Sequence, residues 1–226
     1  LQTNNQNKKK QKNNLKIVKR SATSVAESTQ PTISLVPKIE INPIIVFTGT
    51  WNVNGQPPPQ TLEPWLVRKD VKPDIYAIGF QELDLSATAL VLGDSGKAAP
   101  WEAAIQSTLA TVGDYIKLAT KQLVGILLCV YVKRNLYPRI NDVQSDLMPT
   151  GVMGVMGKKV GVPISFNVFD STVCFVNAHL NAHVDNVTSC NQDSHDTERE
   201  IVFFRQGRRS TIWEHEFLFW IGDLNY

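Results

Sequence analysis

Four short apolar runs in this chain each end in amide, carboxylate or imidazole side chains, and this pattern constrains the fold most. The runs are residues 44–50, 74–80, 171–180 and 217–222, and the polar segments at their ends are WNVNG, FQE, NAHLNAH and GDLNY. Apolar, β-branched runs of this length predict buried strands. If these strands lie side by side, their polar ends converge on one cleft.

The residue types at these ends favour binding of a divalent cation and a phosphate. Charged and amide side chains are costly to bury unless they are paired or bind a metal. A cleft with two carboxylates, several amides and two imidazoles suits a hard cation and a phosphoester. Each segment alone also fits a structural role, since Asn-x-Asn-Gly commonly forms a turn. The four segments together, in this order, are much more specific.

The remaining periodicity predicts an α/β fold that is rich in strands. Apolar positions at helical spacing alternate along the chain with continuous apolar, β-branched runs. We expect helices at 61–69, 101–112 and 185–206, paired strands at 114–120 and 123–132, and a hairpin formed by 160–169 and 171–180.

The composition indicates a folded domain that follows a polar leader. Hydrophobic residues make up 42% of the 226 residues, enough for a sizeable core. Residues 1–40 are instead rich in Asn, Gln and Lys and carry a net charge of +6, so we expect a disordered leader and a domain over 41–226. The leader's lysines could contact an anionic membrane or RNA, and a solvated linker is the simpler interpretation.

Several sequence features favour a cytoplasmic location. No run approaches the roughly 18 apolar residues of a membrane-spanning helix. The polar start lacks the apolar segment of a secretory signal. Cys129, Cys174 and Cys190 are too few and too scattered for a disulfide framework. We therefore expect a protein of the reducing cytosol.

Five segments of the sequence resemble successive signature blocks of one enzyme family. They are GTWNVNG, GFQELDLS, TGVMGVMGKKVGV, VNAHLNAH and FWIGDLNY. In this order they resemble the inositol polyphosphate 5-phosphatases, most of all the type II group that includes the Lowe-syndrome phosphatase. The resemblance covers roughly residues 44–226 and implies a DNase I-like, four-layer αββα sandwich, incomplete at its C-terminal end.

The resemblance also implies roles for residues at the strand ends. Asn52 and Glu82 would hold Mg²⁺ through oxygen, the ligand type that this ion prefers. Asp223 would orient and deprotonate the attacking water. Asn225 and His179 would donate hydrogen bonds to phosphate oxygens. The implied reaction is hydrolysis of a 5-phosphate by direct attack of water, without a phosphoenzyme.

The same family resemblance implies that the glycine-rich loop and the histidine block bind the substrate. Lys159 would contact a neighbouring ring phosphate, and Lys158 and His183 would be further substrate-binding residues. The family loop reads MGNKGGV, so Lys158 and Val160 depart from it and leave the substrate preference open. The implied partners are phosphoinositide headgroups or soluble inositol phosphates, with peripheral contact at the cytosolic face of membranes.

The resemblance further implies that the domain is longer than this chain. The family's Arg- and Lys-containing block and its Ser-Asp-His block do not occur after Tyr226. None of the four histidines stands in an equivalent Ser-Asp-His context. We therefore expect this polypeptide by itself to be weakly active or inactive, and to leave an open sheet edge that favours aggregation.

Two alternatives stay open at this stage. A Mg²⁺-dependent nuclease of the same superfamily would use Asn52, Glu82, Asp223 and Asn225 equally well, and the net charge of −4 over residues 41–226 argues against it. The second alternative is a catalytically dead phosphoinositide-binding module, whose ligand binding would change little if Glu82 were replaced by Ala. The charges at 193–209 predict a solvated helix face, whose arginines are candidates for lipid headgroup contacts, namely Arg205, Arg208 and Arg209.

Overall fold

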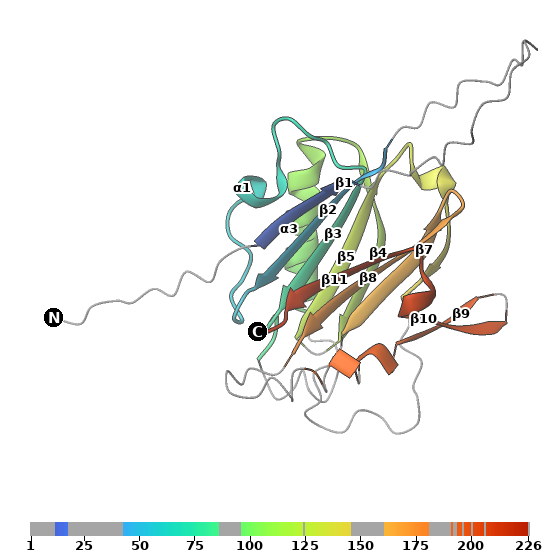
Figure 1. Cartoon of the computed structure of the whole chain (residues 1–226). Coiled ribbons are helices and arrows are strands. Elements are labelled where there is room, and N and C mark those ends of the chain that lie inside the picture. Colours follow the sequence, from blue (N-terminus) through green and yellow to red (C-terminus); the bar gives the residue numbers. More distant parts are fainter. Residues whose placement is uncertain are drawn as a thin grey trace, which may run out of the picture.

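The computed structural model is a sandwich of two β-sheets with helices on an outer face (Figure 1). It describes the backbone of 12–17 and residues 43–85, 96–123, 125–145, 161–180, 191, 194–195, 197–199, 201–205 and 207–225. Among these residues no helix is long and apolar enough to cross a membrane. The α/β sandwich predicted from the sequence is confirmed.

The first sheet has five strands in the order β1-β2-β3-β5-β4. Its strands are β1 (Lys12–Ile17), β2 (Ile45–Asn52), β3 (Ile75–Gln81), β4 (Tyr115–Leu123) and β5 (Ile126–Lys133). β2 and β3 run parallel, whereas the other pairs are antiparallel. The predicted pairing of the strands now labelled β4 and β5 is confirmed.

The second sheet has four strands in the order β11-β8-β7-β6. Its strands are β6 (Ile140–Gln144), β7 (Val162–Val168), β8 (Ser171–His179) and β11 (Phe217–Asp223). β7 and β8 form the predicted hairpin, and β11 runs parallel to β8 at the sheet edge. The short strand β6 was not predicted, since Asn141 and Asp142 interrupt its apolar pattern.

Alternation along the strands creates two cores. On β3, Ile75 and Ala77 face the second sheet, whereas Tyr76, Ile78 and Phe80 belong to the core beneath the helices. Because both faces of a central strand are covered, its sequence is continuously apolar. This explains why 74–80 predicted a buried strand.

The helices cover the outer face of the first sheet with aromatic side chains. They are α1 (Glu63–Leu66), which is shorter than the predicted 61–69, and α3 (Ala98–Ala110), which begins and ends slightly earlier than the predicted 101–112. Trp65 and Trp101 meet Phe80 at ring-centroid distances of 5.7 and 4.6 Å. Such aromatic packing fixes the helices behind the carboxyl ends of β2 and β3.

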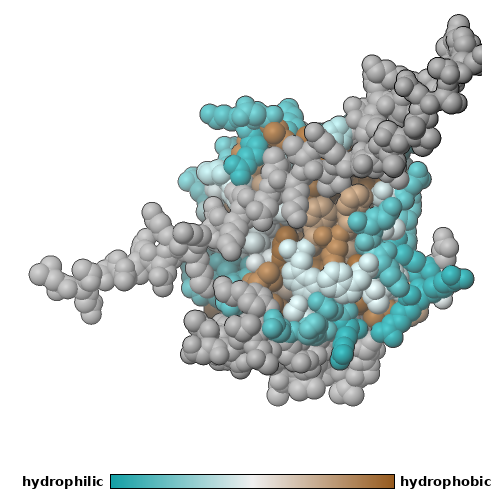
Figure 2. Space-filling model, viewed as in Figure 1, coloured by the Kyte–Doolittle hydropathy of each residue, from teal (hydrophilic) through white to brown (hydrophobic). Residues whose placement is uncertain are grey.

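The core between the sheets is bordered by half-buried apolar residues. Phe219 of β11 stacks on Phe175 of β8, and the flanking Phe217 and Ile221 remain partly exposed. Figure 2 shows hydrophobic residues reaching the surface near the middle of one face, between hydrophilic residues along its sides.

The end of the helix predicted over 185–206 is instead the first strand of a hairpin. β9 (Val202–Arg205) pairs with β10 (Arg208–Thr211), and η2 (Ile212–Glu214) follows. Only the positions up to Arg199 that the structure describes are helical, so the prediction for 185–206 is wrong at its C-terminal end. The physical reason is burial: Phe203 packs against the second sheet, which stabilises an extended conformation over local propensity.

Six residues of the predicted leader form a strand. Lys12–Ile17 forms β1 and pairs antiparallel with β2, with Leu15 opposite Phe47. Backbone hydrogen bonds along a sheet edge depend little on side-chain hydrophobicity, so a polar segment can occupy one. The rest of 1–40 lies outside the described residues.

Candidate active site

Two pairs of parallel strands end at the same place. Asn52 at the end of β2 is in register with Gln81 at the end of β3, and Asp223 at the end of β11 is in register with His179 at the end of β8. Because β11 also lies against β2, the carboxyl ends of all four strands meet (Figure 1). The convergence predicted from the sequence is therefore confirmed.

Asn52 joins the two carboxylates of this site. Its amide nitrogen donates to Glu82 Oε1 at 2.8 Å and to Asp223 Oδ2 at 3.0 Å. His179 Nε2 lies 3.8 Å from the same Glu82 oxygen. The His179 side chain is almost fully buried, whereas 23% of the Glu82 side chain is accessible. Four of the predicted residues thus lie within contact distance of one another.

The backbone around Glu82 is held in an uncommon conformation. Glu82 has a φ of 55° and Asn54 a φ of 50°, both in the left-handed region. Gly55 N donates to the Glu82 carbonyl at 2.7 Å, and Leu83 N donates to the Gly125 carbonyl at 2.9 Å. A non-glycine residue in this region costs about 1–3 kcal/mol unless its surroundings enforce it. These bonds therefore hold the carboxylate at the sheet end.

Asn225 and Asp223 are tied to the end of β8. Leu180 N donates to the Asp223 carbonyl at 3.0 Å, and the Asn225 amide nitrogen donates to the Leu180 carbonyl at 2.8 Å. Asn225 also has a positive φ, of 52°. The chain therefore turns sharply after β11 and brings the Asn225 side chain to the same strand end as His179.

Gly222 allows β11 to approach β8 closely. Its φ is 134°, and a Cβ at this position would lie 1.9 Å from the Ala178 carbonyl oxygen. No other residue fits this conformation and distance, because both require the absence of a side chain. The glycine in GDLNY therefore positions Asp223.

A buried amide network lies directly behind the site. Asn177 is fully buried, and its amide nitrogen donates to the carbonyls of Phe80 at 3.0 Å and Leu127 at 2.8 Å. Gln81 Nε2 donates to Asn177 Oδ1 at 2.7 Å and to Thr50 Oγ1 at 2.9 Å. Asn177 thereby joins the second sheet to the first, next to Glu82.

Sequence reasoning missed Gln81 and Asn177 as functional positions. The available signal was an amide side chain inside each of two otherwise apolar strands, since a buried polar group needs a partner. Gly79 completes the arrangement: a Cβ there would lie 2.6 Å from Asn177 Cγ. The glycine before FQE therefore makes room for the network.

The chemistry of the donor set suits a hard divalent cation. Glu82 and Asp223 supply carboxylate oxygens, and no described Lys or Arg pairs with either. No three His, Cys, Asp or Glu side chains in the described ranges form a metal cage. Mg²⁺ in proteins is commonly bound by one or two carboxylates together with water and substrate oxygens, and Glu82 and Asp223 are carboxylates of that kind.

Asn52 presents its nitrogen, not its oxygen, to the carboxylates in this structure. Its Oδ1 accepts a hydrogen bond from Asn54 N at 3.1 Å. A metal ligated by Asn52 needs the amide turned over, a rotation that conserves its shape. The predicted proximity of Asn52 and Glu82 is confirmed, and their role as metal ligands stays a prediction.

Buried thiols argue against cysteine-based phosphate chemistry. Burial raises the pKa of both Cys129 and Cys174 to about 12. A thiol with so high a pKa supplies almost no nucleophilic thiolate near neutral pH. Neither of these two cysteines lies among the described residues of the site, and Cys190 lies outside the described residues.

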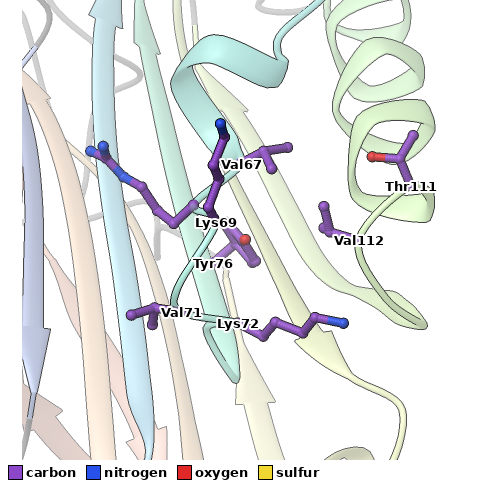
Figure 3. A pocket seen from close by; sticks show the side chains of 8 residues that line it. Val67, Lys69, Val71, Lys72, Tyr76, Thr111 and Val112 are labelled. Carbon is purple, nitrogen blue, oxygen red and sulfur yellow. The ribbon is translucent and has the colours of Figure 1, made fainter.

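Three predicted substrate-binding residues are not placed. Lys158, Lys159 and His183 lie outside the described residues, as does the glycine-rich loop. A described pocket of about 200 Å³ lies elsewhere, beside Tyr76 near the start of β3 (Figure 3). Val67, Val71 and Val112 line it, and the Lys69 and Lys72 side chains point in different directions from its rim. It is therefore separate from the strand ends that hold Glu82.

Comparison with known proteins decides the family. The model of endonuclease/exonuclease/phosphatase family 2 matches residues 49–226. The chain belongs to this family. It is 40% identical to mouse type II inositol 1,4,5-trisphosphate 5-phosphatase and 34% identical to human synaptojanin-1, over 80% and 81% of its own length. Its relatives are thus inositol polyphosphate 5-phosphatases, as the motifs implied.

A solved structure supports the same assignment. The chain matches the inositol polyphosphate 5-phosphatase domain of SpSynaptojanin, solved with inositol (1,4)-bisphosphate and a calcium ion, with a TM-score of 0.68 and 32% identity. The match covers 80% of this chain and 52% of that domain chain. The chain spans only 18% of the mouse relative and 13% of the human one.

Proposed function

We propose that the protein is a Mg²⁺-dependent phosphomonoester hydrolase that removes the 5-phosphate from inositol polyphosphates or phosphoinositide headgroups. One observation carries the proposal: Asn52 holds the Glu82 and Asp223 carboxylates together at the joined ends of both sheets. The family relationship supports the reaction class, since relatives at up to 40% identity are named inositol 5-phosphatases.

Glu82 and Asn52 are the residues proposed to hold the cation. The Glu82 carboxylate provides an anionic oxygen, and Asn52 adds a neutral one when its amide is turned over. When bound, Mg²⁺ supplies Lewis acidity that neutralises charge on the phosphoryl oxygens. His179, 3.8 Å from Glu82, limits the positions that the Glu82 carboxylate can adopt.

Asp223 is the proposed base for the attacking water. The water oxygen forms a bond to phosphorus while the bond from phosphorus to the ring oxygen breaks. The water proton passes to the Asp223 carboxylate, and the ring oxygen keeps the electron pair and takes a proton to become a hydroxyl. Asn225 and His179 carry donor groups at the same strand end, suited to phosphate oxygens as charge develops on them.

The other phosphates of the inositol ring are proposed to be bound by Lys158, Lys159 and His183. The solved relative was crystallised with an inositol bisphosphate, which supports a soluble inositol phosphate as one substrate. We propose phosphoinositide lipids as the second source of the same headgroup. A location at the cytosolic face of membranes belongs to this proposal.

The test measures phosphate release from inositol 1,4,5-trisphosphate by the full-length protein, with and without Mg²⁺. Glu82→Gln removes a charged oxygen while conserving shape, and we expect turnover at least about 100-fold lower. Asp170→Asn is the matched control, because Asp170 is an exposed carboxylate at the opposite end of β8. We expect Asp170→Asn to keep turnover within about two-fold.

Two results would overturn the proposal. If the Glu82→Gln variant and the unchanged protein had equal turnover, Glu82 would have no role in the reaction. Cleavage of duplex DNA without phosphate release from inositol phosphates would assign the site to the nuclease branch of the family.

A further inference from the structure

The β9–β10 hairpin is fixed firmly to the second sheet by residues next to its turn. Arg205 donates to Asn167 and Ser165 of β7 and pairs with Asp142 of β6 at 3.0 Å. The Gln144 side chain forms two hydrogen bonds with the backbone of Phe204, of 2.9 and 3.0 Å. The orientation of the hairpin is therefore set by side chains of the sheet.

The hairpin and the 3₁₀ turn that follows it carry exposed aromatic rings and guanidinium groups. Phe204 is 48% exposed and Trp213 of η2 is 62% exposed. Arg209 lies directly opposite Phe204 in the hairpin register and shares its outward face, whereas Arg208 is exposed opposite Arg205 on the other face. We call Phe204, Arg208, Arg209 and Trp213 the hairpin surface. An exposed tryptophan and phenylalanine on a rigid element indicate a contact surface.

The charge of this surface is positive. The segment 202–213 contains three arginines and no acidic residue. Arg205 pairs with Asp142 of β6. Arg208 and Arg209 are exposed and make no ion pair with any described residue. The two acidic residues that follow the segment hydrogen-bond to the backbone: Glu214 accepts from Thr211 N, and Glu216 accepts from Thr172 N, each at 3.0 Å.

We propose that the hairpin surface docks the protein on an anionic lipid bilayer. Aromatic rings beside arginines are the combination that favours the interface of a membrane with acidic lipids. The hairpin stands out from the body beside β7 (Figure 1), and a deformable bilayer accepts such a protrusion, whereas a protein partner needs a matching hollow. The inference rests on the proposed function, because docking would bring an enzyme that hydrolyses lipid headgroups to its substrate.

The hairpin surface lies away from the residues of the active site. The hairpin is hydrogen-bonded to β6 and β7, and its buried Phe203 packs against Cys174 and Val176 of β8. The exposed side chains of the hairpin surface have no described contact with Asn52, Glu82 or Asp223. Changes at Phe204, Arg208, Arg209 or Trp213 therefore leave the chemistry intact. This separation allows docking and hydrolysis to be measured independently.

The experiment measures co-sedimentation of the purified protein with vesicles of phosphatidylcholine, with and without phosphatidylserine. We expect binding to the anionic vesicles that falls about ten-fold or more in Arg208→Gln/Arg209→Gln, because each basic residue near the surface contributes several-fold to partitioning. Phe204→Ser/Trp213→Ser should lower binding similarly. Both double variants should hydrolyse soluble inositol 1,4,5-trisphosphate within about two-fold of the unchanged protein.

Matched controls change basic and aromatic side chains of the same kinds elsewhere on the surface. Arg68→Gln/Lys69→Gln removes two exposed charges beside the Tyr76 pocket, and Phe169→Ser removes an aromatic ring that is 53% exposed. Both controls should bind vesicles as the unchanged protein does.

The outcomes separate the two proposals. Unchanged vesicle binding by the hairpin variants would overturn the docking inference, as would an equal loss in the controls. Absence of binding by the unchanged protein would also overturn it and favour a protein partner. Failure to hydrolyse the soluble substrate would overturn the proposed function alone, because vesicle binding does not require turnover.

Discussion

Asn52 donates a 3.0 Å hydrogen bond to Asp223, a residue 171 positions later in the chain. The bond joins the last residue of β2 to the last residue of β11, and so the first sheet to the second. A second bond of 2.8 Å from the same nitrogen reaches Glu82. One amide therefore sets the distance between the carboxylate proposed to hold a cation and the carboxylate proposed to activate water.

The Asn52 amide can be tested by removing it. Asn52→Ala leaves two carboxylates close together without their shared donor, so they repel each other and lose their orientation. We expect kcat to fall about 100-fold or more, as when a group that orients a metal ligand or a transition state is lost. Steady-state kinetics at saturating Mg²⁺ checks this. An unchanged kcat would show that the carboxylates are positioned without Asn52.

Gly222 offers a test of the close approach of β11 and β8. Gly222→Ala places a methyl group 1.9 Å from the Ala178 carbonyl oxygen at a φ of 134°, so the strand must move. We expect a loss of more than about 3 kcal/mol in the free energy of unfolding, or insoluble protein. Urea denaturation measures it. Gly207→Ala is the control, because its φ of 75° is also positive but no atom lies within 4 Å, and it should cost about 1 kcal/mol.

The sequence predicted the strands of both sheets well where burial on both faces produced continuous apolar runs. β3 and β5 are examples, since seven of the eight residues of β5 are buried. It failed for β9, where the charges of Arg205 and its neighbours indicated a solvated helix. Arg205 is instead held by Asp142, Ser165 and Asn167, partners on other strands that no local pattern reveals.

The candidate site was predictable for a different reason. Asn52, Glu82, His179 and Asp223 each stand just where an apolar run ends, so the parallel register aligns the strand ends within each sheet and the contact of β11 with β2 brings the two sheets' ends together. Gln81 and Asn177 stand in the same polar segments, FQE and NAHLNAH, but no role was predicted for them because their partners are not local in sequence. Their partners, the carbonyls of Phe80 and Leu127 among them, belong to a sheet packing that is not visible in the order of residues.

Asn177 provides a test of the buried network. Asn177→Ala leaves the carbonyls of Phe80 and Leu127 and the amide of Gln81 without this partner in a dry interior. Each unpartnered buried group costs about 1–3 kcal/mol, and relaxation reduces the sum, so we expect about 2–4 kcal/mol of lost stability. Thermal and urea unfolding measure it.

A surface asparagine supplies the control for Asn177. Asn141→Ala removes an exposed side-chain hydrogen bond to Asn167 and should cost less than about 0.5 kcal/mol. Because Gln81 precedes Glu82, Asn177→Ala should also lower kcat while KM for the soluble substrate changes little. Equal stability of the two variants would mean that the network does not hold the sheets together.

The pH dependence of stability should report on His215. Burial lowers the pKa of His215, and Arg205 adds to this, with its Nη2 3.4 Å from His215 Nε2. His215 Nε2 also lies 2.7 Å from Ser165 Oγ, and its Nδ1 lies 3.0 Å from the Ile212 carbonyl oxygen. Glu214 acts in the opposite direction and favours the protonated ring. The net effect favours neutral His215 in the folded protein.

The sign of the expected pH effect follows from this lowered pKa. The unfolded chain takes up the proton first, near its ordinary value of about 6.5, so the contribution of His215 is fully present above that pH and is lost as pH falls through the folded pKa. We expect the free energy of unfolding to decrease between about pH 7 and pH 5 more steeply than in His215→Gln. Urea denaturation across this range measures both slopes. Parallel slopes for the two proteins would show that His215 keeps the same pKa when the chain unfolds.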